Sequence, residues 1–204
     1  MNNDLKNHWE NIYSNKDENE VSWFQTIPKT SHQLIKKLNL ESNDNIIDIG
    51  SGRSRILKIL IEEGFNNISY LDISKEACKK SKIALGDDKS KVNWNVENVL
   101  NFKSKIKYNL WHDRAVFHFF TNKKDIEKYK EVAIKNVSDG GYLVLGTFSI
   151  NGPKKCSGLD VSQYSEQSLN EIFKSDFNLL ESFYIDHQTP FDTTQNFLFC
   201  IFKK

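Results

Sequence analysis

The chain has 204 residues, with 28 basic and 27 acidic side chains and a formal net charge of +1. This length suits one domain with a sizeable core, and the balanced charge argues against a nucleic-acid-binding surface. The sequence contains neither the apolar core of a signal peptide nor an apolar run of membrane-spanning length. Three cysteines without C-x-x-C spacing favour a reducing compartment and argue against a zinc site. We therefore expect a cytoplasmic protein without a metal, a membrane contact or a nucleic-acid partner.

Residues 1–28 form an N-terminal arm that is rich in aromatic side chains. One face of a short helix carries four large side chains: Leu5, Trp9, Ile12 and Tyr13. Trp23 and Phe24 follow after a polar stretch. Two interpretations stay open. The tryptophans hold the arm onto the core, or the arm is a lid whose Trp23 and Phe24 close over a cofactor or an acceptor.

A helix is expected to begin at Pro28 and to end near Leu40. The stretch Asn45–Leu57 then combines a β-branched apolar run, two glycines and the start of an amphipathic helix. Such a run suits a buried parallel strand, and Gly50 and Gly52 allow a sharp turn close to a ligand. Strand, glycine turn and helix together are typical of the first unit of a nucleotide-binding α/β domain.

The glycine turn does not fit a dinucleotide site, because Arg55 stands where the third glycine of G-x-G-x-x-G is needed. Asp48, two residues before Gly50, would oppose a pyrophosphate but suits a cation such as an amino group. The D-x-G-x-G pattern resembles motif I of the class I S-adenosylmethionine (SAM) methyltransferases, although their usual third glycine is Ser54 here. The resemblance implies that Gly50, Ser51 and Gly52 approach the methionine part of SAM, and that Asp48 helps to hold its amino group.

The second strand is expected at Ile68–Leu71 and ends at Asp72, followed by Ile73. Asp72 lies 22 residues after Gly50, about the spacing at which an acidic residue binds ribose hydroxyls in this fold. Ser74 is the expected N-cap of the next helix, Lys75–Leu85. After the third strand, Lys91–Val96, the resemblance implies that the Asn98 amide and the Val99 backbone read the adenine.

Three ionisable residues, His112, Asp113 and Arg114, leave the fourth expected strand, Tyr108–Trp111. Ligands bind at the carboxyl ends of strands in open α/β sheets, so these residues are the candidate catalytic group. His112 could take a proton, Asp113 could orient an acceptor or the cofactor's ammonium, and Arg114 could lower the pKa of a nearby thiol. The structural alternative is an Asp–Arg ion pair at a helix start, with partly buried histidines.

The rest of the sequence predicts the remaining elements of the sheet. A helix at Lys123–Val137 leads to a strand at Tyr142–Thr147, a long loop over 149–164 and a helix at Glu166–Lys174. Two β-rich runs, 178–186 and 196–202, have no helix between them and must form an antiparallel hairpin. We expect a Rossmann-like α/β fold over residues 1–204, as a single domain with helices on both faces. Its seven-stranded sheet is mostly parallel, with an antiparallel C-terminal hairpin strand, as in class I methyltransferases.

The resemblance makes SAM the expected cofactor and S-adenosylhomocysteine (SAH) the expected product. The segment around Asp113-Arg114 resembles the Trp-Asp-Arg-Gly segment of thiol and thiopurine S-methyltransferases, with Ala115 in place of glycine. The first expectation is therefore a small-molecule acceptor, a thiol or sulfide. The alternative is a protein-lysine N-methyltransferase, a group with a similar arm but with Asp-Lys-Gly at this point. A SAM-binding module without transfer is a third possibility.

Overall fold

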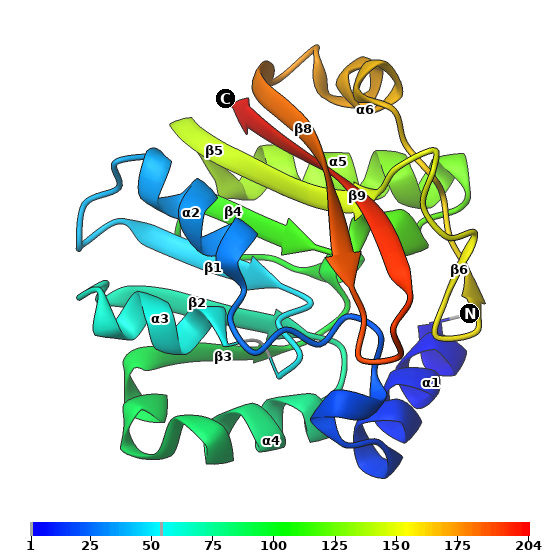
Figure 1. The fold of residues 1–204 in the computed structure, drawn as a ribbon. Coiled ribbons are helices and arrows are strands. Elements are labelled where there is room, and N and C mark those ends of the chain that lie inside the picture. The colour runs from blue at the N-terminus through cyan, green and yellow to red at the C-terminus, as the bar shows by residue number, and fades with distance from the viewer. Residues whose placement is uncertain (1, 54) are drawn as a thin grey trace.

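The computed structural model describes residues 2–53 and 55–204, so Ser54, at the usual third-glycine position, lies outside the described residues. Seven strands form one sheet in the order β3-β2-β1-β4-β5-β9-β8 (Figure 1). Their bounds are β1 Asn45–Ile49, β2 Asn67–Asp72, β3 Val92–Val96, β4 Tyr108–Arg114, β5 Val137–Phe148, β8 Asn178–Gln188 and β9 Thr194–Lys203. Strands β1 to β5 pair in parallel, and β9 pairs antiparallel with both β5 and β8. The expected sheet with its inserted antiparallel strand is confirmed.

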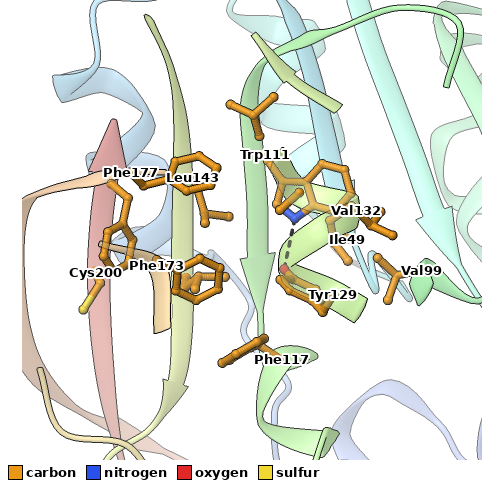
Figure 2. Packing of buried hydrophobic residues seen from close by; sticks show 14 of the residues in the cluster. Ile49, Val99, Trp111, Phe117, Tyr129, Val132, Leu143, Phe173, Phe177 and Cys200 are labelled. Atoms are coloured by element: carbon orange, nitrogen blue, oxygen red, sulfur yellow. Dashed lines mark hydrogen bonds between the residues drawn. The ribbon is translucent and has the colours of Figure 1, made fainter. Parts of the chain in front are cut away.

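Helices cover both faces of the sheet. Their bounds are α1 Asn2–Asn15, α2 Lys29–Lys37, α3 Ile56–Glu62, α4 Lys75–Leu85, α5 Lys123–Asn136 and α6 Glu166–Phe173. In Figure 1, α2 and α3 lie in front of the sheet and α5 lies behind it. The front core contains Leu34, Leu57 and Leu110, and the core behind contains Trp111, Tyr129 and Phe173 (Figure 2). Burial of these two apolar layers is the main favourable term for the fold.

The 149–164 segment is not a plain loop. It contains a two-stranded ribbon made of β6 (Lys155–Cys156) and β7 (Leu159–Asp160). In Figure 1 this segment lies beside α1 and the N-terminus, at the edge where the parallel strands end. Within the described residues, no helix reaches the length and apolarity that a membrane span needs. The same residues contain no cluster of three or more His, Cys, Asp or Glu side chains that could hold a metal.

Candidate active site

Two neighbouring cavities open at the carboxyl ends of β1, β2 and β4. The first, called here the polar cavity, is lined among others by Ser31, Asp48, Ser51 and His112. The second, called the aromatic cavity, is lined among others by Trp9, Asp72, Asn98, Phe119 and Cys156. Five residues line both: Tyr13, Trp23, Ile49, Gly50 and Arg114. The two cavities therefore meet over the glycine turn, where open α/β sheets bind their ligands.

The glycine turn requires glycine for two separate reasons. Gly50 and Gly52 have φ angles of +60° and +55°, a region that other residues rarely adopt. A Cβ on Gly50 would also lie 2.0 Å from Val116 Cγ2, and one on Gly52 would lie 2.3 Å from the Tyr13 hydroxyl. The N-terminal arm and the segment that follows β4 thus pack directly against the turn. Ser51, between the two glycines, is buried, and its Oγ has no hydrogen-bond partner among the described residues.

Asp72 joins the end of β2 to the glycine turn. Its Oδ2 accepts from the Gly52 amide at 2.8 Å, and its Oδ1 accepts from the Ser74 amide at 2.8 Å. Burial raises the pKa of Asp72 to about 6, although both of these hydrogen bonds lower it. Ser74 caps α4 as expected, by accepting from the Ala77 amide. The carboxylate keeps further lone pairs for a ligand, because each of its oxygens can accept more than one hydrogen bond.

The expected adenine-reading residues lie in the same cavity as Asp72. Asn98 and Val99 line the aromatic cavity, and so does Ile73, which was expected to bind the cofactor without an assigned part of it. The Asn98 side chain caps the short helix Val99–Asn101 by accepting from the Leu100 amide at 2.9 Å. This cap fixes the Asn98 side chain at the wall of the aromatic cavity.

His112 forms a buried chain with two partners from distant parts of the sequence. Its Nδ1 lies 2.7 Å from Asp48 Oδ1, and its Nε2 lies 2.9 Å from Ser31 Oγ. Each of the three residues is at most 3% exposed. Both ring nitrogens of His112 are thus occupied, which does not favour the expected role as a base for an acceptor. Ser31, on the first turn of α2, carried no signal in the sequence that pointed to this contact.

Asp113 lies on the opposite face of the sheet from His112 and Arg114. Strand β4 continues to Arg114 instead of ending at Trp111, and side chains alternate between the faces of a strand. The Asp113 carboxylate accepts from the Val116 amide at 2.9 Å and from the Tyr129 hydroxyl at 2.6 Å. It is fully buried and lines neither cavity. The expectation that the three ionisable residues form one catalytic group is therefore wrong for Asp113.

The partner of Asp113 belongs to a buried polar pair behind the sheet. Trp111 Nε1 donates to the Tyr129 hydroxyl at 3.0 Å, as Figure 2 shows. Burial raises the pKa of Asp113 to about 6, and the hydrogen bond from Tyr129 opposes that rise. This arrangement gives Asp113 a structural role at the start of the turn after β4, without the ion pair to Arg114 that the structural alternative contained.

Arg114 carries a positive charge into both cavities. Its Nη1 donates to the Trp23 carbonyl at 3.2 Å, and its guanidinium lies 5.0 Å from the centre of the Phe197 ring. Among the described residues, no carboxylate forms an ion pair with it. Burial lowers the pKa of Arg114 to about 10, so the group stays charged at neutral pH. A partly buried cation without a counter-ion is costly, which favours an anionic ligand at this point.

The N-terminal arm supplies most of the aromatic wall. The Trp9 ring lies 5.7 Å from Trp23 and 5.2 Å from Phe119, in edge-to-face contacts. Glu10, one residue further on, accepts from the Lys75 and Glu76 amides and thereby ties α1 to the start of α4. Phe24 lines only the polar cavity, where Arg55 lies over its ring. The sequence pointed to Trp23, but it did not single out Tyr13, Phe119 or Cys156 as residues of the site.

Ala115 has a backbone conformation that glycine adopts more easily. Its φ is +73°, and its amide donates to the Gly146 carbonyl at 2.8 Å. We expect Ala115→Gly to raise the free energy of unfolding by up to about 1 kcal/mol, because relief of the left-handed strain exceeds the added chain entropy. Urea unfolding measures this change. Ala133→Gly, inside α5, is the control, and its free energy of unfolding should fall by about 1 kcal/mol or more, because Ala133 also loses a buried methyl group. Equal losses at both positions would contradict the strain at Ala115.

Comparisons with known proteins agree with this geometry. Residues 40–197 match the family described as a methyltransferase domain. The EEF1A lysine methyltransferase 2 of Danio rerio is 26% identical over 188 residues, which cover 86% of this chain and 76% of that protein. A SAM-dependent methyltransferase from Anabaena variabilis has a TM-score of 0.76 at 13% identity, over 99% of this chain and 94% of that one. A structure solved for the conversion of a disulfide bond into a thioacetal group during echinomycin biosynthesis has a TM-score of 0.80 at 13% identity, over 98% and 92%.

Proposed function

The chain belongs to the methyltransferase domain family and is an enzyme that uses SAM, and we propose that it methylates a small thiol or sulfide. In this proposal residues 1–204 act as one domain, and residues 1–28 form a lid over the two cavities. The protein acts in the cytoplasm, which fits its three free cysteines, Cys78, Cys156 and Cys200.

The residues present fit the cofactor. Two buried oxygen atoms in the polar cavity, Asp48 Oδ2 and Ser51 Oγ, have no partner among the described residues. A carboxylate and a hydroxyl are suitable partners for the ammonium and carboxylate of an amino-acid moiety. We assign Asp72 to the ribose, and Ile73, Asn98 and Val99 to the adenine. Trp23 and the glycine turn lie where the two cavities meet, so they would hold the part of SAM between its amino-acid group and its ribose.

SAM supplies a methyl group on a sulfonium, which is already a good leaving group. The protein must therefore mainly align the acceptor with that methyl group and exclude water. Trp9, Trp23 and Phe119 provide an apolar wall for this purpose. Cys156, in the 149–164 segment, lines the same cavity. An acceptor that carries a proton must lose it before or during the transfer.

The observation that carries the choice of acceptor is Arg114. Its guanidinium lines both cavities and has no carboxylate partner among the described residues. A fixed positive charge lowers the pKa of a nearby thiol and stabilises the thiolate, which is the reactive form. The same charge repels a protonated amine. It therefore favours a soft, anionic nucleophile over a lysine side chain.

A protein-lysine acceptor is the second candidate. It is supported by the similarity to the EEF1A lysine methyltransferase 2 of Danio rerio over most of this chain. The aromatic wall is compatible with this acceptor too, because aromatic faces attract alkylammonium groups. This candidate requires that the lysine amine is neutral when it binds beside Arg114, or that it binds away from the Arg114 guanidinium.

The test is SAH release from purified protein and SAM across a panel of acceptors. The panel contains sulfide, small thiols, small amines, intact cell lysate and lysate digested with protease. Release with sulfide or a thiol alone, above the rate without protein, supports the S-methyltransferase proposal. Release only with undigested lysate would overturn it and leave the lysine candidate. Release with amines alone would overturn the choice of a soft acceptor.

A further inference from the structure

The geometry points to a positioning function for His112 and Ser31. We infer that they hold the Asp48 carboxylate so that its free oxygen binds the ammonium of the cofactor's amino-acid part. This inference rests on the proposed function, because it assigns a role toward SAM. It replaces the expected role of His112 as a base and adds Ser31, which no sequence pattern singled out.

The three residues come from three elements that meet at the polar cavity. Asp48 lies on β1, His112 is its neighbour on β4 in the sheet register, and Ser31 lies on α2. The contacts run in one line, from Ser31 Oγ to His112 Nε2 at 2.9 Å and from His112 Nδ1 to Asp48 Oδ1 at 2.7 Å. Because α2 is anchored by Leu34 and Ile35 in the front core, Ser31 holds the ring from a rigid helix.

The line ends at an atom that needs a ligand. Asp48 Oδ2 is buried, lines the polar cavity and has no hydrogen-bond partner among the described residues. A buried acceptor that stays unpaired is costly, whereas an ammonium would satisfy it with a charge-assisted bond. With a proton on Nδ1, the ring donates to Asp48 Oδ1, and Nε2 pairs with the Ser31 hydroxyl, so Oδ2 is the one atom of the three side chains that lacks a partner among the described residues.

Residues that do not touch a ligand can still determine its affinity, because they orient the side chains that do touch it. In metal sites, removal of a partner that orients a ligating side chain typically lowers metal affinity or activity by about 10- to 100-fold, and we expect an effect of similar size here. His112 touches Asp48 but would not touch the ligand in this arrangement, so it is a positioning residue. Its loss should weaken only those ligands that carry the amino-acid part.

Two ligands separate this role from a general packing role. SAH carries the amino-acid part, whereas 5′-methylthioadenosine keeps the adenosine and lacks that part. Isothermal titration calorimetry of the full chain should show that His112→Ala weakens SAH binding by about 10-fold or more. Affinity for 5′-methylthioadenosine should stay within about 2-fold. Ser31→Ala, which removes one neutral hydrogen bond, should weaken SAH binding by about 5-fold.

A conservative pair of variants locates the effect. The Asn side-chain amide can take the place of Nδ1 and donate to Asp48, whereas a Gln amide instead extends toward Ser31. We therefore expect His112→Asn to recover much of the SAH affinity and His112→Gln to recover less. Asp72→Asn is the matched control, because a ribose contact should affect both ligands alike.

Each remaining outcome decides against one of the two proposals. Equal losses of affinity for SAH and 5′-methylthioadenosine, in both His112→Ala and Ser31→Ala, would overturn the inference. They would show that the contacts between Ser31, His112 and Asp48 serve only to pack the protein. Unchanged SAH affinity in both variants would also overturn it. If the unaltered protein binds neither ligand, the cofactor assignment itself fails. Circular dichroism shows whether each variant is folded. If His112→Ala does not fold, the comparison of the two ligands is made with Ser31→Ala instead.

Discussion

Replacing Asp72 with alanine is expected to lower SAH affinity by about 100-fold or more. The carboxylate is buried at the edge of the aromatic cavity, where it is the assigned acceptor for two ribose hydroxyls. Each lost charge-assisted hydrogen bond is worth about 1.5–3 kcal/mol, and two such bonds account for this factor. The measurement is calorimetric titration with SAH, and affinity like that of the unaltered protein would refute the cofactor assignment.

The same substitution also removes two contacts within the protein. The Gly52 and Ser74 amides would lose their acceptor, so the free energy of unfolding should fall by about 1–3 kcal/mol. Asp72→Asn is the milder control, because it keeps one acceptor oxygen. Circular dichroism and urea unfolding separate loss of the ribose contact from loss of the fold.

The pKa of Asp72 predicts the pH dependence of cofactor binding. Burial raises this pKa to about 6, so the group is ionised at pH 7.5 and mostly protonated at pH 5. Protonation removes the negative charge and turns one oxygen into a hydroxyl donor, so SAH affinity should fall as the pH drops through about 6. In Asp72→Asn this dependence should flatten.

Replacing Arg114 with alanine is expected to lower turnover with a thiol acceptor by about 10- to 30-fold at pH 7. Without the guanidinium, the bound thiol returns toward its free pKa of about 8.5, and only a few per cent is thiolate at neutral pH. SAH affinity should change far less. The measurements are kcat and KM for the acceptor, together with calorimetric titration with SAH.

A pH profile distinguishes an effect on the acceptor from a loss of structure. Raising the pH from 7 to 9 should restore much of the rate of Arg114→Ala, because the thiol then ionises without help. Arg114→Lys keeps the positive charge, so its turnover at pH 7 should lie between that of the unaltered protein and that of Arg114→Ala. Arg55→Ala is the matched control, since Arg55 lines the polar cavity but already pairs with Glu18 at 2.6 Å. An unchanged kcat for Arg114→Ala would return Arg114 to a structural role.

Some of the site could be predicted from the sequence because its determinants are local. Positive φ at Gly50 and Gly52 follows from a turn between a buried strand and a helix, and both residues occupy that region. The Ser74 cap is equally local, and so is the hairpin after residue 178. A chain of two strands without a helix between them has only the antiparallel solution.

The sequence by itself determined the sheet, the glycine turn and the position of Asp72 at the end of β2. It did not determine which face of the sheet the side chains of His112, Asp113 and Arg114 would take, because the sequence did not show that β4 continues through them to Arg114. Only the tertiary structure separated Asp113 from Arg114 and brought Ser31, 81 positions away, against His112. Such contacts depend on how a helix packs against a sheet, and no local pattern encodes that packing.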